Sequence, residues 1–87
     1  LNGTIQVAGT ITDTQGEYVI GASVVISSKR IGTLSDFDGN FSLSNIEQAD
    51  TLSVFMHGFE RQNILLIQYP EKNGRIELNI QLVPQKK

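Results

Sequence analysis

The chain has no cysteine and no tryptophan, and only two of its 87 residues are proline. The absence of cysteine rules out disulfides, thiolate metal sites and a cysteine nucleophile. No run approaches the about 20 apolar residues of a membrane-spanning helix, so we expect a module that does not itself span a membrane. No charged-then-apolar leader is present. Because the chain begins with Leu1 and not with methionine, we expect a trimmed fragment of a larger protein.

A concentration of positive charge is also missing. Seven lysine and arginine residues stand against nine acidic ones, and the basic residues are scattered along the chain. A protein that binds the phosphate backbone needs a basic stripe, so we expect no nucleic-acid partner. The composition, 39% hydrophobic and 18% charged, is typical of a folded chain. At this length we expect a single domain over residues 1–87, with its core at about 5–83.

What the sequence does contain is alternation of apolar and polar residues, which predicts β-strands. The alternation is cleanest near the C-terminus, where Ile76, Leu78 and Ile80 share one face and polar residues occupy the other. No segment has a sustained apolar stripe at helical spacing, and the best helical candidate, 44–49, is too short to be stable. The predicted strands cover residues 5–12, 22–27, 41–43, 52–56, 64–67 and 75–83.

Short strands separated by polar turns predict an all-β sandwich in which two sheets enclose one layer of side chains. The apolar run 64–67 is consistent with a strand that is covered on both faces. Pro84 removes a backbone donor, so we expect the fold to end there.

Two polar segments predict tight turns. In Asp13–Glu17 the aspartate can accept backbone amides and Gly16 can take a positive φ. The segment from Gly32 to Leu43 reads as a polar turn that opens into a strand, with Gly39 as its left-handed residue.

The second turn also invites a calcium interpretation, because Asp36, Asp38 and Asn40 place oxygens at alternate positions. A calcium loop between helices requires glycine where this chain has Phe41. We therefore favour a hairpin turn and keep a weak irregular cation site as the alternative.

No reaction centre is evident in the sequence. His57 is the single histidine, and we expect it on the outer face at a strand end. None of the serines lies in a nucleophile elbow, and no phosphate-binding loop is present. The chain is therefore expected not to be an enzyme, and to need no cofactor.

Four aromatic residues lie in or beside turns: Tyr18, Phe37, Phe59 and Tyr69. In such positions they can stack on a sugar or a partner chain. We favour the alternative in which Phe37 and Phe59 fold back and close the ends of the sandwich.

Several segments occur in an order that is characteristic of one family. They are Val7–Asp13, Gly16, Ile20–Val24, Gly32–Thr33, Ser35–Leu43 and Leu52–Glu60, the last running through Gly58 into an aromatic residue. Together they resemble the carboxypeptidase regulatory-like family, and above all its branch at the N-terminus of SusC-type TonB-dependent outer-membrane transporters of Bacteroidetes. The pattern departs from the family at Val19 and Ile20, where proline and leucine are usual.

This resemblance implies a seven-stranded, transthyretin-like Greek-key sandwich without catalytic residues. It also implies a periplasmic location, with the plug and barrel of a parent transporter or other envelope proteins as partners. The residues that carry the turn and core motif are Gly16, Gly21, Gly32, Asp36, Gly39, Phe41 and Gly58. Two other functions stay open: a carbohydrate- or calcium-binding module of an envelope protein, and a folding-assistance domain attached to a peptidase.

Overall fold

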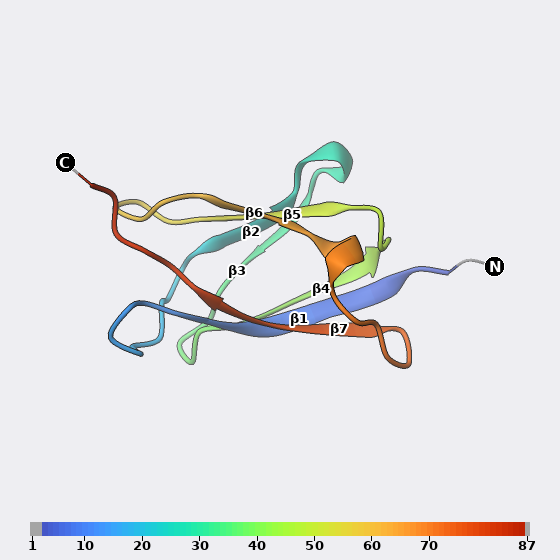
Figure 1. Cartoon of the computed structure of the whole chain (residues 1–87), viewed down its shortest axis with the longest axis horizontal. Helices are drawn as coiled ribbons and strands as arrows, with labels where there is room; N and C mark the ends of the chain where they lie inside the picture. Colours follow the sequence, from blue (N-terminus) through green and yellow to red (C-terminus); the bar gives the residue numbers. More distant parts are fainter. Residues whose placement is uncertain (1–2, 87) are drawn as a thin grey trace.

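The computed structural model describes residues 3–86 and contains seven β-strands and two short 3-10 helices, η1 and η2 (Figure 1). The described chain ends lie at opposite ends of the long axis. The elements in chain order are β1 Ile5–Thr12, β2 Ser23–Ile26, η1 Ser27–Lys29, β3 Ile31–Leu34, β4 Asn40–Ile46, β5 Thr51–Phe55, β6 Gln62–Leu65, η2 Leu66–Gln68 and β7 Arg75–Gln81.

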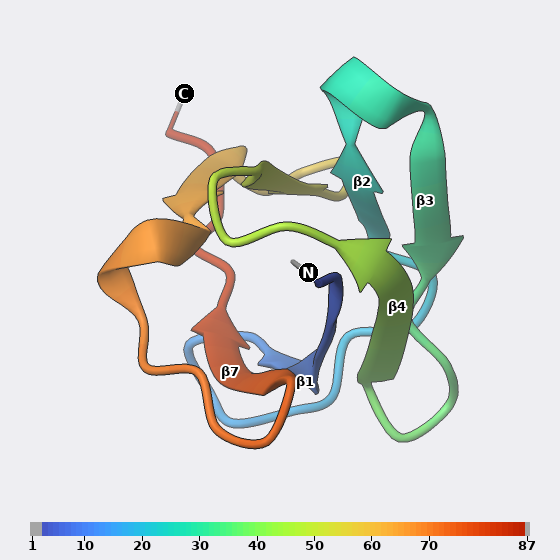
Figure 2. The same cartoon turned by 90° about the vertical axis from the view of Figure 1, so that its right-hand side faces the viewer.

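The strands form two sheets that pack face to face (Figure 2). One sheet has three strands in the order β4-β1-β7, with β1 antiparallel to β4 and parallel to β7. The other has four strands in the order β3-β2-β5-β6, all antiparallel to their neighbours. The predicted all-β, seven-stranded sandwich is confirmed.

The core consists of the inward-facing residues of both sheets. The predicted inner face of β7 is confirmed, because Ile76, Leu78 and Ile80 are buried. The inward apolar residues of β1, β2, β4 and β5 are buried as well. Gly9 sits where β1 passes between its two neighbours, and a Cβ there would collide with the Leu78 carbonyl oxygen and contact the Phe41 ring. The fully buried large side chains include Ile11, Ile26, Ile46, Leu52, Leu66, Ile76 and Leu82.

The segment from Gly32 to Leu43 differs from its prediction at its start. Gly32 lies within the edge strand β3, and the turn begins only after Leu34. A Cβ at Gly32 would lie 2.8 Å from Val25 Cγ1, so this glycine makes room for a side chain of the adjacent strand. Strand β3 was not predicted, because it is short and its inward residues are only half-buried.

Residues 44–49 are not helical, as their short length led us to expect: β4 continues to Ile46 and a turn follows. Two further expectations were wrong. The run 64–67 is not covered on both faces: it leaves β6 for η2, and Leu65 and Ile67 are exposed. The fold also continues past Pro84, since the amide of Gln85 donates a 2.9 Å hydrogen bond to the Gly58 carbonyl oxygen.

Candidate functional site

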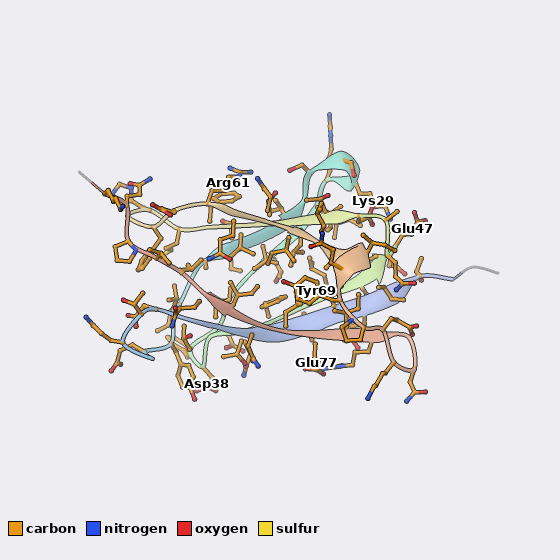
Figure 3. The ribbon with its side chains drawn as sticks, in the orientation of Figure 1. Lys29, Asp38, Glu47, Arg61, Tyr69 and Glu77 are labelled. Carbon is orange, nitrogen blue, oxygen red and sulfur yellow. The ribbon has the colours of Figure 1, made fainter. Side chains whose placement is uncertain are left out.

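The β3–β4 turn is organised around the carboxylate of Asp36. Its Oδ1 atom accepts hydrogen bonds from the amides of Asp38 and Asn40, both at 2.9 Å. Gly39 completes the turn with a φ of 72°, in the left-handed region that favours glycine. The side chain of Asp38 lies on the outside of this turn (Figure 3).

The β1–β2 turn repeats this arrangement. Oδ1 of Asp13 accepts hydrogen bonds from the amides of Gln15 at 2.8 Å and Glu17 at 3.0 Å. Gly16 has a φ of 80°. The carboxylate oxygen Oδ1 of each aspartate is therefore engaged by its own turn, which is a common use of aspartate in turns.

Two of the oxygen atoms considered for a cation, Oδ1 of Asp36 and Oδ1 of Asn40, accept hydrogen bonds within the protein. Oδ1 of Asn40 accepts a 2.9 Å hydrogen bond from the Thr10 hydroxyl. Within residues 3–86, no three histidine, cysteine or acidic side chains gather in a way that could hold a metal ion. His57 lies exposed in the turn after β5, as expected.

The remaining motif residues occupy structural positions. Gly21 and Gly58 lie outside the strands with φ values of 81° and 90°. Phe41 points into the core and is 5% exposed. Ser35 has a structural role that was not predicted: its buried hydroxyl accepts a hydrogen bond from the Ala22 amide at 2.9 Å and donates one to the Val19 carbonyl oxygen at 2.7 Å. The position of Ser35 directly before the Asp36 turn was the one feature of the sequence that could have indicated this role.

The aromatic residues near turns divide into two groups. Phe59 is half-buried and packs against the core, so its predicted closing role is confirmed. Phe37 is 83% exposed, so the prediction that it folds back was wrong. Tyr18 and Tyr69 are exposed as well.

A shallow cavity of about 290 Å³ lies between the edge strands of the two sheets, beside the Asp36 turn. Its lining comes from the end of β3, the turn and the start of β4: Thr33, Leu34, Asp36, Asn40, Phe41 and Ser42. Both apolar and polar atoms therefore face the same opening, on the flank of the sandwich where β3 and β4 are the outermost strands (Figure 2).

The end of the molecule away from the Asp36 turn carries an ion pair. Nζ of Lys29 lies 2.7 Å from Oδ2 of Asp50, which also accepts the Glu47 amide at 2.9 Å. Partial burial alone would raise the pKa of Asp50, but the hydrogen bonds and the lysine charge outweigh it and lower that pKa. The hydrogen bond to Asp50 raises the pKa of Lys29. Figure 3 shows Lys29 and Glu47 together at this end.

The two outer sheet faces differ in chemistry. On the three-stranded sheet, polar side chains bond across strands: Gln6 donates to the Ser42 hydroxyl at 2.8 Å and accepts from Arg75 at 2.7 Å. On the four-stranded sheet the Arg61 guanidinium lies 4.4 Å from the centre of the Phe55 ring.

No helix in residues 3–86 is long and apolar enough to cross a membrane.

The sandwich fold, its paired aspartate turns and its order of motifs together define a regulatory-like β-sandwich module. The chain belongs to the CarboxypepD_reg-like domain family, whose model matches residues 7–87. Among curated proteins it is similar to the TonB-dependent receptor SusC of Bacteroides thetaiotaomicron, with 47% identity over 60 residues. The match covers 69% of this chain and 6% of the SusC sequence, so the chain corresponds to a small part of that relative.

Solved structures with the same fold come from other bacterial proteins. A cohesin–X-dockerin complex from Acetivibrio cellulolyticus superposes with a TM-score of 0.71 at 16% identity, over 92% of this chain and 58% of that one. The major pilin subunit BcpA of Bacillus cereus gives a TM-score of 0.62 at 16% identity, over 95% of this chain and 31% of that one. At such identities the likeness establishes the fold alone.

Proposed function

We propose that the chain is a non-catalytic accessory domain of a TonB-dependent outer-membrane transporter that takes up glycans or other nutrients. The domain lies on the periplasmic side of the outer membrane. It acts through contacts with the plug and barrel of its parent transporter or with other periplasmic envelope proteins.

The observation that carries this proposal is the similarity to SusC, 47% identity over 60 residues, together with membership of the regulatory-like family. The arrangement of the described residues is consistent with it. Oδ1 of Asp36 is engaged by backbone amides and Oδ1 of Asn40 by the Thr10 hydroxyl, and His57 is exposed. Protein contact through sheet edges and faces is the chemistry that such a surface supports.

Deletion of residues 3–86 from the parent transporter tests the proposal. We expect slower growth on a nutrient whose uptake depends on the transporter, while the amount of barrel in the outer membrane stays unchanged. Transporter abundance is the essential control, since a folding-assistance role would lower abundance and growth in parallel. Growth like the wild type at unchanged abundance would contradict a role in uptake.

A further inference from the structure

The two flanks of the sandwich are closed to different degrees. On the β6 and β7 flank, the chain passes from η2 to β7 across the gap between the sheets (Figure 2). The side-chain nitrogen Nε2 of Gln62 also donates to the Gln81 carbonyl oxygen, and the backbone amide of Glu60 donates to the Val83 carbonyl oxygen at 2.8 Å. On the other flank, β3 and β4 are joined by the Asp36 turn and then diverge.

Edge strand β3 presents backbone groups that no neighbouring strand uses. The Ser35 amide donates to the Ala22 carbonyl oxygen at 2.9 Å, and β2 and β3 pair in regular antiparallel register. In such a ladder, alternate residues turn their N–H and C=O groups toward the partner strand. Thr33 therefore bonds to β2, whereas Gly32 and Leu34 direct these groups outward from the sheet.

Strand β3 is short, which limits pairing at a sheet edge, but it lacks three other protecting features: a charged side chain, a proline and a bulge. Its sequence is Ile-Gly-Thr-Leu, without a charge or a proline, and its pairing with β2 contains no bulge. Leu34 is 61% exposed, and Phe37, in the turn that follows, is the most exposed of the large hydrophobic residues described. An uncharged and partly apolar edge without a bulge is a template for an added strand.

The surroundings of this edge indicate the chemistry of the added strand. Because Thr33 pairs with the buried Val24, its side chain faces inward, where the cavity of about 290 Å³ lies. A residue opposite Thr33 would direct its side chain into this cavity. Asp36 and Asp38 lie at the end of the edge where β3 stops, and neither has an ion-pair partner within residues 3–86.

We propose that β3 binds an extended peptide segment of a partner protein by strand addition, which enlarges the four-stranded sheet to five strands. The segment hydrogen-bonds to Gly32 and Leu34, inserts an apolar side chain into the cavity, and carries a lysine or arginine beside Asp36 and Asp38. Main-chain bonds supply affinity in this mode, and the pocket and the charges supply specificity. This inference is independent of the transporter context.

Selection of a random peptide library displayed on phage against the isolated chain tests the inference. We expect enriched peptides that alternate apolar and polar residues and carry a basic residue near one end. Their affinity should fall at least tenfold for Leu34→Lys, which places a charge on the edge. Leu65→Lys is the matched control, because Leu65 is 48% exposed on β6, the opposite edge of the same sheet. No enrichment, or equal loss with both variants, would overturn the proposal.

Amide hydrogen exchange with an enriched peptide locates the contact. We expect the amides of Gly32 and Leu34 to become protected on binding, and Asp38→Asn to weaken binding and its dependence on salt. Protection along β4 or β6 instead would overturn the assignment to β3. Protection of β3 without added peptide, rising with protein concentration, would also overturn it, because the occupant would then be a second copy of the chain.

Discussion

The Ser35 hydroxyl donates a 2.7 Å hydrogen bond to the carbonyl oxygen of Val19, and both residues are buried. Oγ of Ser35 also accepts a hydrogen bond from the Ala22 amide, so this one side chain fixes the segment that leads into β2 against the end of β3. Its removal would leave a donor and an acceptor of the backbone without partners in the interior.

Ser35→Ala should therefore lower the free energy of unfolding by about 1–3 kcal/mol, the cost of leaving buried polar groups unsatisfied. Urea denaturation measures this loss. Ser44→Ala serves as the control because Ser44 is exposed, and it should be nearly neutral. Equal stability of the two variants would show that water or a local shift replaces the Ser35 contacts.

A pair of glycine variants separates backbone strain from steric contact. Gly16 and Gly39 have similar φ values, 80° and 72°. A Cβ at Gly16 would meet open space, whereas at Gly39 it would lie 2.6 Å from the Ile11 carbonyl oxygen. Gly16→Ala should cost about 1–2 kcal/mol, the price of a left-handed residue with a side chain.

Gly39→Ala should cost clearly more than Gly16→Ala, because backbone must move as well. Thermal or urea unfolding of both proteins gives the comparison. If both variants lose the same free energy of unfolding, the turn around Asp36 accommodates the added methyl group without displacing β1. The close approach of Gly39 to Ile11 would then have no effect on stability.

The core residue Phe41 and the turn residue Phe37 provide a third test. From the sequence, Phe41 was assigned to the turn and core motif, and Phe37 was expected to close an end of the sandwich. Phe41 is 5% exposed and Phe37 is 83% exposed. Phe41→Ala should cost about 3–5 kcal/mol of unfolding free energy. Phe37→Ala should change it by less than about 0.5 kcal/mol, as is usual for exposed positions. A large loss of stability with Phe37→Ala would mean that this ring covers part of the core in solution.

Most strands could be predicted from the sequence, because a strand that faces the core on one side alternates apolar and polar residues. The central strand β1 and the edge strand β7 both show this pattern, and their inward residues are buried as expected. Strand β3 escaped prediction because Ile31 and Thr33 are only half-buried, so its alternation is weak. The run 64–67 was wrongly predicted to be covered on both faces, because Leu65 and Ile67 are apolar although they are exposed.

The order of strands within the sheets could not be read from the sequence. Strand β1 pairs with β7, the last strand along the chain, and alternation within a strand carries no information about its neighbour. The candidate peptide-binding edge depends on that order, since β3 is exposed only because it stands last in its sheet. Turn chemistry is local, so the roles of Asp13 and Gly16 followed directly from their spacing.

The ion pair between Lys29 and Asp50 predicts how stability depends on pH. Because the hydrogen bonds and charge around Asp50 lower its pKa in the folded state, folding favours the ionised carboxylate. This contribution is complete above the pKa of the unfolded chain, about 4, and is lost as the pH falls through the lower folded value. The raised pKa of Lys29 acts in the alkaline range, where stability is lost as the pH rises through the folded value.

Urea midpoints of the wild-type chain and Asp50→Asn, measured from neutral to acidic pH, test this dependence. We expect the variant to be less stable at neutral pH, and the difference to shrink as the pH falls from about 4, the unfolded pKa, through the lower folded pKa of Asp50. The stability difference between Lys29→Met and the wild type should also shrink at acidic pH. The double variant should lose less than the sum of the two single variants, because both remove the Lys29–Asp50 pair, although Lys29→Met also removes the 3.7 Å contact with Glu47. A difference that stays constant down to acidic pH would show that Asp50 stabilises the turn by geometry alone, through the Glu47 amide, and that the charge of Lys29 contributes nothing measurable.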